Sequence, residues 1–175
     1  MDNSTEGVTL NSVFINDVLS NYDKSKYPEL YRIVDGVKLE GNVSMDIYND
    51  LCMWIERNLG KFNLIKVGRT IGETVHGQFM RNNLINADSK PIDIVKALKL
   101  VASQMIQDPK GRGWDIISDE SKKIVVRRTQ TFNGKLQLGL LDGLVRKSKV
   151  TGVRVDFVKE VELGDEFDEY QITWL

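Results

Sequence analysis

Residues 136–144 read LQLGLLDGL, and this stretch decides how the second half of the chain folds. Its leucines recur every third or fourth residue, which predicts a helix over residues 132–146 with one apolar face. Gly139 and Gly143 lie one turn apart on an adjacent face. Because glycine has no side chain, we expect another backbone to approach the helix closely there.

Alternating apolar and polar residues flank this helix on both sides. Residues 114–117 and 124–128 predict two strands joined by a polar turn. Residues 153–157 and 170–174 predict a second pair of strands around the turn at Gly164-Asp165. A period of two leaves one apolar face of each hairpin on the core. We therefore expect a four-stranded antiparallel sheet packed on helices.

The first half of the chain is dominated by helical periodicity. Ser44 can cap a helix that ends before Gly60, a residue type favoured just beyond a helix C-terminus. Gly68, Gly72 and Gly77 interrupt a later helical pattern and lower its helix propensity, so we expect tight packing against a neighbour, or a bend, as compensation. The fold class is α+β, with N-terminal helices followed by hairpin, helix and hairpin. The predicted helices cover residues 13–19, 28–37, 44–60, 63–84 and 91–106.

Length and composition indicate one ordinary globular domain. Of the 175 residues, 41% are hydrophobic and 28% are charged. The chain contains no linker segment and no internal repeat that would mark a domain boundary. We predict a single domain over residues 1–175, in which residues 1–10 are a flexible tail. No run approaches the roughly 18 apolar residues of a membrane span, and the start lacks the pattern of a signal peptide. The sequence predicts a cytoplasmic protein without a membrane span.

The charge balance disfavours nucleic acid as a partner. The net charge is −1 and the pI is about 5.9, so the chain lacks the positive field that drives non-specific nucleic-acid binding. Basic residues do gather at Lys122, Lys123, Arg127 and Arg128. We interpret them as a solvated strand face rather than a nucleic-acid footprint, because acidic residues over 160–169 offset their charge.

The sequence offers little material for catalysis or metal binding. His76 is the only histidine and Cys52 the only cysteine, which excludes sites built on clusters of either residue. His76 lies mid-helix without an orienting carboxylate nearby in sequence, and Cys52 lies on an amphipathic helix between apolar neighbours. We predict no catalytic residue, no metal site and no cofactor.

The second half of the chain resembles a family of ligand-sensing domains. Residues 138–144, the valine-rich segment 153–155 and the segment GDEFDEYQITW at 164–174 resemble the C-terminal signature of 4-vinyl-reductase-type domains. These are relatives of the TRAPP vesicle-tethering subunits and of the H-NOX haem–nitric-oxide domains. Residues 65–79 also look like a helix of a bacterial domain of unknown function that is abundant in myxobacteria.

Two departures from this family pattern bear on the ligand. The last hairpin lacks the cysteines found in many 4-vinyl-reductase-type relatives, and residues 125–132 do not reproduce the Tyr-x-Ser-x-Arg haem motif of H-NOX domains. Because of these two departures, we predict a sensor domain of this kind that binds no haem.

The resemblance implies a non-enzymatic domain with a hydrophobic pocket for a small apolar ligand. Cys52, His76 and Trp114 are the residues expected near that pocket. The alternative is an assembly module that forms a homodimer, or binds a signalling protein, through its glycine-bearing helices. A haem-based nitric oxide sensor and an enzyme are the weaker alternatives.

Overall fold

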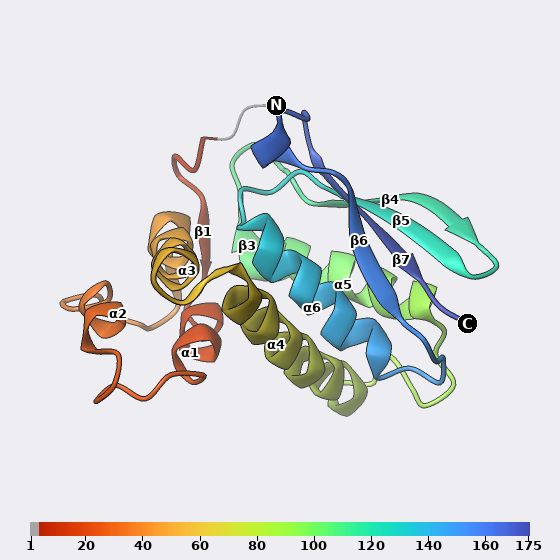
Figure 1. The fold of residues 1–175 in the computed structure, drawn as a ribbon, viewed down its shortest axis with the longest axis horizontal. Helices are drawn as coiled ribbons and strands as arrows, with labels where there is room; N and C mark the ends of the chain where they lie inside the picture. The colour runs from red at the N-terminus through yellow and green to blue at the C-terminus, as the bar shows by residue number, and fades with distance from the viewer. Residues whose placement is uncertain (1–3) are drawn as a thin grey trace.

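The structure is a computed structural model that describes residues 4–175 (Figure 1). It is an α+β fold in which a four-stranded antiparallel sheet is covered by helices, as the sequence predicts. A second, three-stranded sheet and a group of helices formed by the first third of the chain lie beside this layer.

The three-stranded sheet is absent from the predictions. Strand β1 (Thr9–Asn11) pairs antiparallel with β2 (Asn42–Ser44) on one side and with β3 (Ile106–Gln107) on the other. Strands of two or three residues are too short to show alternation in the sequence. The prediction of a flexible tail over residues 1–10 is wrong for its last part, because Val8 and Leu10 are buried in the core. Residues 1–3 of that predicted tail lie outside the described residues.

Among the helices of the first third, α3 (Met45–Leu59) has the end signals that the sequence shows. Helix α1 (Val13–Leu19) follows β1, and the short α2 (Pro28–Arg32) replaces the longer helix predicted over 28–37. Helix α3 begins as predicted, since the Ser44 hydroxyl accepts a hydrogen bond from the Asp46 amide at 3.2 Å. It ends at Gly60, whose φ of 88° is readily adopted only by glycine.

Helices α4 (Lys61–Arg81) and α6 (Gly134–Arg146) lie side by side with their backbones in contact (Figure 1). A Cβ built on Gly68 would overlap the carbonyl oxygen of Leu136 and lie 3.1 Å from the Cα of Gly139. One turn later, a Cβ on Gly72 would meet Gly143 in the same way. The predicted role of these four glycines is confirmed.

This packing corrects the predicted route to a dimer. The glycine faces of α4 and α6 cover each other within one chain, so they are not free to contact a second copy. The exception is Gly77, whose Cβ would meet only the Arg81 side chain at 3.5 Å. A homodimer stays a prediction, and its contact would have to use other surfaces.

The larger sheet has the strand order β4-β5-β7-β6, and every neighbouring pair is antiparallel. Helix α6 packs against β6 and β7, and α5 (Pro91–Met105) packs against β4. Side chains along β5 point alternately into and away from the core, and Ile124, Val126 and Arg128 are the buried ones. A 3-10 turn, η1 (Val161–Leu163), connects the last two strands. The strands are β4 (Trp114–Glu120), β5 (Lys123–Arg128), β6 (Arg154–Lys159) and β7 (Asp168–Thr173).

The buried apolar side chains form one cluster that extends from β1 to β7. Its largest fully buried members include Tyr48, Phe79 and Tyr170. Within residues 4–175, no helix combines the length and apolar character needed to cross a bilayer.

Candidate functional site

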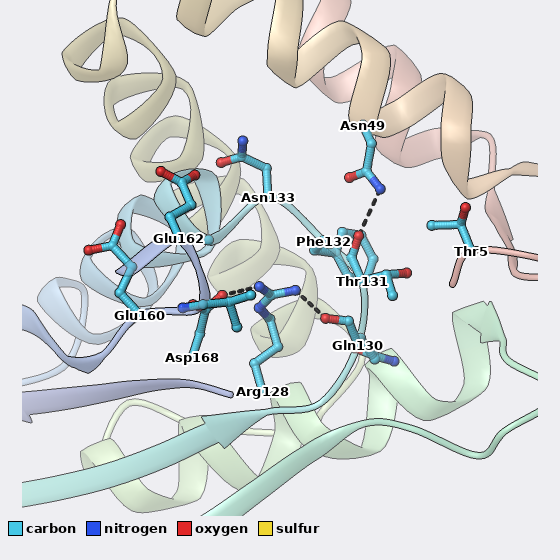
Figure 2. Close-up of a pocket in the computed structure, with 12 residues that line it drawn as sticks. Thr5, Asn49, Arg128, Gln130, Thr131, Phe132, Asn133, Glu160, Glu162 and Asp168 are labelled. Atoms are coloured by element: carbon cyan, nitrogen blue, oxygen red, sulfur yellow. Dashed lines mark hydrogen bonds and ion pairs between the residues drawn. The ribbon is translucent and has the colours of Figure 1, made fainter. Parts of the chain in front are cut away.

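A polar pocket of about 210 Å³ opens between helix α3 and the loops at one end of the four-stranded sheet (Figure 2). Asn49 of α3 lies on one side, and the loop from Arg128 to Gly134, which connects β5 to α6, lies on the other. Residues 160–162 around η1 and Asp168 at the start of β7 complete the wall. The pocket is therefore built from segments far apart in the sequence.

Arg128 is the central charged group of this pocket, and strand geometry places it there. It occupies the inward phase of β5, and Asp168 is its direct partner on β7. The side chains are 5% and 4% exposed and form an ion pair, while a second guanidinium nitrogen donates to the carbonyl oxygen of Gln130 (Figure 2). Burial opposes the charge of Arg128, but Tyr170 and Asp168 outweigh it and raise its pKa. Arg128 is thus a buried guanidinium held charged by its neighbours, which corrects its interpretation as part of a solvated strand face.

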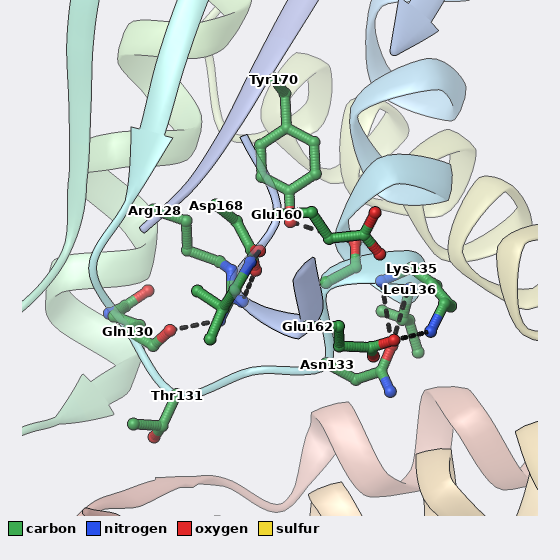
Figure 3. A network of polar contacts seen from close by, with 12 residues as sticks. Arg128, Gln130, Thr131, Asn133, Lys135, Leu136, Glu160, Glu162, Asp168 and Tyr170 are labelled. Carbon is green, nitrogen blue, oxygen red and sulfur yellow. Dashed lines mark hydrogen bonds and ion pairs between the residues drawn. The ribbon is translucent and has the colours of Figure 1, made fainter. Parts of the chain in front are cut away.

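A network of polar contacts fixes the surrounding backbone (Figure 3). The amide of Val161 donates to the second oxygen of Asp168 at 2.8 Å, which ties η1 to the ion pair. The hydroxyl of Tyr170 donates to the carbonyl oxygen of Gly134 at 3.0 Å, and burial raises the pKa of this phenol, so it stays protonated. The side-chain amide nitrogen of Asn49 donates to the carbonyl oxygen of Thr131 at 2.7 Å and joins α3 to the loop between β5 and α6.

Four buried polar atoms in this region have no hydrogen-bond partner. They are Nε of Arg128, Oε1 of Gln130, Oγ1 of Thr131 and Oδ1 of Asn49, and all four residues line the polar pocket. Among residues 4–175 these are the buried side-chain nitrogen and oxygen atoms that lack a partner. An unsatisfied buried group costs about 1–3 kcal/mol. All four residues lie in the wall of one pocket, and their unpaired atoms are themselves closed to solvent, so a ligand would pair with them only after the side chains of the wall turn toward it.

The pocket walls carry more negative than positive charge. Arg128 is the one cation among the lining residues, against the carboxylates of Glu160, Glu162 and Asp168, which gives a net charge of −2. Burial and the neighbouring Glu162 raise the pKa of Glu160. Lys135 of α6 lies next to the pocket and pairs with Glu162 (Figure 3). It also pairs with Glu56, at 2.7 Å. This electrostatic balance disfavours an anionic ligand and favours one that donates hydrogen bonds.

A smaller, apolar cavity of about 40 Å³ lies deeper in the core. Helices α1, α3, α4, α5 and α6 and the start of β4 surround it, and five aromatic side chains line it: Phe14, Tyr48, Phe79, Trp114 and Phe132. The ring of Phe132 packs edge to face on Tyr48 at a centroid distance of 5.1 Å. Gln130 and Phe132 line both this apolar cavity and the polar pocket, so a single residue layer separates the two.

The three residues predicted near a pocket are not brought together. Trp114 lines the apolar cavity and is 4% exposed. Cys52 is fully buried on α3 and lines neither cavity, and burial, together with Glu56, raises the pKa of its thiol. His76 is half-buried on α4 and also lines neither cavity; desolvation and Lys147 lower its pKa.

The sequence analysis did not single out five residues of this candidate site: Asn49, Arg128, Gln130, Thr131 and Asp168. Arg128 carried a usable signal, because it follows Ile124 and Val126 in the apolar phase of its strand. The other residues carried none, since they converge only through the fold.

The apolar cavity does not fit a haem. Pockets that enclose a drug-sized ligand have about 300–1,000 Å³, and this cavity has about 40 Å³. Aromatic rings fill the space around it, and its lining residues include no histidine. The residues present therefore disagree with a macrocycle at this position.

Comparisons with known proteins point to one fold. No protein-family model matches the chain, and no curated protein matches it. Among solved structures, an H-NOX protein from S. oneidensis in its Fe(II)NO ligation state superposes with a TM-score of 0.71 at 10% identity, covering 95% of this chain and 99% of that one. A T. tengcongensis H-NOX variant superposes with a TM-score of 0.63 at 16% identity, covering 93% of each chain. These identities carry the fold alone, and the chain has the fold of H-NOX domains.

Proposed function

We propose that this chain is a non-enzymatic small-molecule-binding domain with sensory character, and that its site is the polar pocket rather than a hydrophobic one. The observation that carries the proposal is that the four residues with unpartnered buried polar atoms all line one pocket. The H-NOX fold supports a sensory role by analogy only, because a fold does not fix a function. A relationship to the 4-vinyl-reductase-type and TRAPP domains stays a prediction.

Small polar probes test this proposal directly. We expect acetamide and ethylamine, each titrated into the ¹⁵N-labelled protein, to shift the backbone amide signals of residues 128–134, because both probes donate to the unpaired oxygens there. Acetate should shift them far less, because the pocket walls carry a net charge of −2. Signals from the turn at residues 121–122, at the other end of the hairpin, provide the internal control.

Thr131→Val is the matched variant for this experiment. Valine keeps the side-chain shape but removes Oγ1, which has no partner in the folded chain. We expect the free energy of unfolding to stay equal or to rise by up to about 1 kcal/mol, because a buried unpaired group is lost. Probe affinity should fall about threefold to tenfold, the value of one hydrogen bond. Equal shifts at the pocket and at the control turn for every probe would overturn the proposal.

We also propose that the domain takes no haem. Titrating haemin into the purified protein should leave the broad absorption of free haemin, without a sharp Soret band near a 1:1 ratio. His76→Ala is the decisive companion variant, since His76 is the only histidine in the sequence. A sharp band in the parent protein that disappears in His76→Ala would contradict the proposal.

A further inference from the structure

The polar pocket and the apolar cavity are neighbours that share two lining residues. Gln130 and Phe132 line both spaces, on either side of Thr131. The carbonyl oxygen of Gln130 accepts a hydrogen bond from Arg128 in the polar pocket (Figure 2). Its side-chain oxygen, in contrast, is buried without a partner, and the side chain also lines the apolar cavity. A polar group is thus left unsatisfied at the boundary between the two spaces.

Phe132 is the apolar one of the two shared lining residues. It is 7% exposed, and it packs edge to face on two rings. Its ring centroid lies 5.1 Å from that of Tyr48 and 6.5 Å from that of Phe14. Its backbone belongs to the loop between β5 and α6 rather than to a helix or strand. Phe132 lines both spaces and lies outside both sheets, so a turn of its ring need not break a backbone hydrogen bond of either sheet.

We infer that the ligand is amphipathic, with a hydrogen-bond-donating, uncharged or cationic head in the polar pocket and a short apolar tail that displaces the Phe132 ring and enters the apolar cavity. This inference rests on the proposed function, because it assigns the ligand class for the same polar pocket. Two separate observations support the two halves of this ligand. The unpaired polar atoms indicate the hydrogen-bonding groups of the head, and the residues shared by the two spaces indicate where the tail lies.

The chemistry of the head follows from the unpaired atoms. Asn49 Oδ1 and Gln130 Oε1 are acceptors and need donors, whereas Arg128 Nε is a donor and needs an acceptor. A primary carboxamide offers both, through its NH₂ group and its carbonyl oxygen. An alkylamine offers donors alone, and a carboxylate offers acceptors alone in a pocket that already holds three carboxylates.

The chemistry of the tail follows from the cavity. Its wall is mainly aromatic and aliphatic, including Val75, Phe79, Leu98 and Leu140. Burying one methylene there should tighten binding by about fourfold. Because the cavity is small, this gain should continue for a few methylenes and then level off.

A homologous series of primary alkanamides tests the inference on the full chain. We expect the dissociation constants of acetamide, butanamide and hexanamide, measured by NMR titration, to fall by about fourfold per added methylene before the plateau. Hexylamine should bind within about tenfold of hexanamide, and hexanoate at least about tenfold more weakly than hexanamide, because of the like charges around it.

Variants at Phe132 separate the tail from the head. In Phe132→Leu and Phe132→Ala the ring no longer has to move, so the affinity for octanamide should rise at least about tenfold more than the affinity for acetamide does, each relative to the parent protein. Phe132→Leu keeps the test available if the alanine variant fails to fold. Phe157→Leu is the matched control, because Phe157 packs on Tyr170 and lines neither cavity.

The outcomes distinguish the two proposals. If acetamide binds at the pocket but chain length and Phe132 have no effect, the amphipathic ligand is wrong and the polar site stands. If hexanoate binds more tightly than hexanamide, the assignment of the head is wrong. If no probe binds and a crystal structure shows only water on the four unpaired atoms, both the inference and the proposed function fail.

Discussion

Gly139→Ala should abolish stable folding. An ideal Cβ at this position would overlap the carbonyl oxygen of Ile65 and lie 3.0 Å from the amide nitrogen of Arg69, and both obstacles are backbone atoms of α4. Backbone cannot rotate away as a flexible side chain does, so the helices would have to separate along their length. We expect a loss of more than about 3 kcal/mol, beyond the usual range for overpacking, seen as loss of the cooperative urea transition or of soluble protein.

Gly77→Ala is the matched control for this prediction. It is also a helical glycine of α4, but its Cβ would meet nothing closer than the Arg81 side chain at 3.5 Å. Alanine has the higher helix propensity, so the variant should gain about 0.5–1 kcal/mol. If Gly139→Ala unfolds in urea like the parent protein, the contact between the α4 and α6 backbones is not as described.

Breaking the buried ion pair should have the next largest effect. Arg128→Met leaves the Asp168 carboxylate buried with the Val161 amide as its remaining hydrogen-bond donor. Removing one partner of a buried pair costs about 3–5 kcal/mol, because the other charge stays desolvated. We expect this loss in the urea unfolding free energy of Arg128→Met, and a loss of similar size in Asp168→Leu.

The double variant shows whether the loss comes from the unpaired charge. Arg128→Met combined with Asp168→Leu removes both charges and should recover much of the stability that either single variant loses. Lys38→Met provides a surface control, since its ion pair with Glu40 is 80% and 73% exposed and should contribute nothing measurable. Additive losses in the double variant would contradict the account of the pair.

The parts of the fold that could be predicted are those with local signals. Ser44 and Gly60 define the ends of α3, and alternation along residues 124–128 defines β5. The glycines of α4 and α6 predicted a close backbone approach but not its partner. The structure shows that the two helices approach each other. The three-stranded sheet could not be predicted, because β1, β2 and β3 have two or three residues each and pair over long sequence distances.

The candidate site was the least predictable part of the molecule. Three residues were expected near a pocket, Cys52, His76 and Trp114, and of these only Trp114 lines one of the two cavities. Ordinary residues such as Asn49 and Thr131 became candidates because they converge from α3 and from a loop more than 80 positions away, with one atom of each left unpaired. No local pattern encodes such a meeting, because it depends on tertiary packing.

The paired glycines of α4 and α6 also forbid sliding. Gly68 lies against Gly139 and Gly72 against Gly143, so the two helices run in the same direction with matched spacing. A shift of α4 by one turn would keep one glycine pair but would bring the side chain of His76 or of Lys147 against a glycine of the other helix. Both helices therefore have a single permitted register and behave mechanically as one rod. We therefore expect any rearrangement of this domain to move α4 and α6 together, relative to the elements around them.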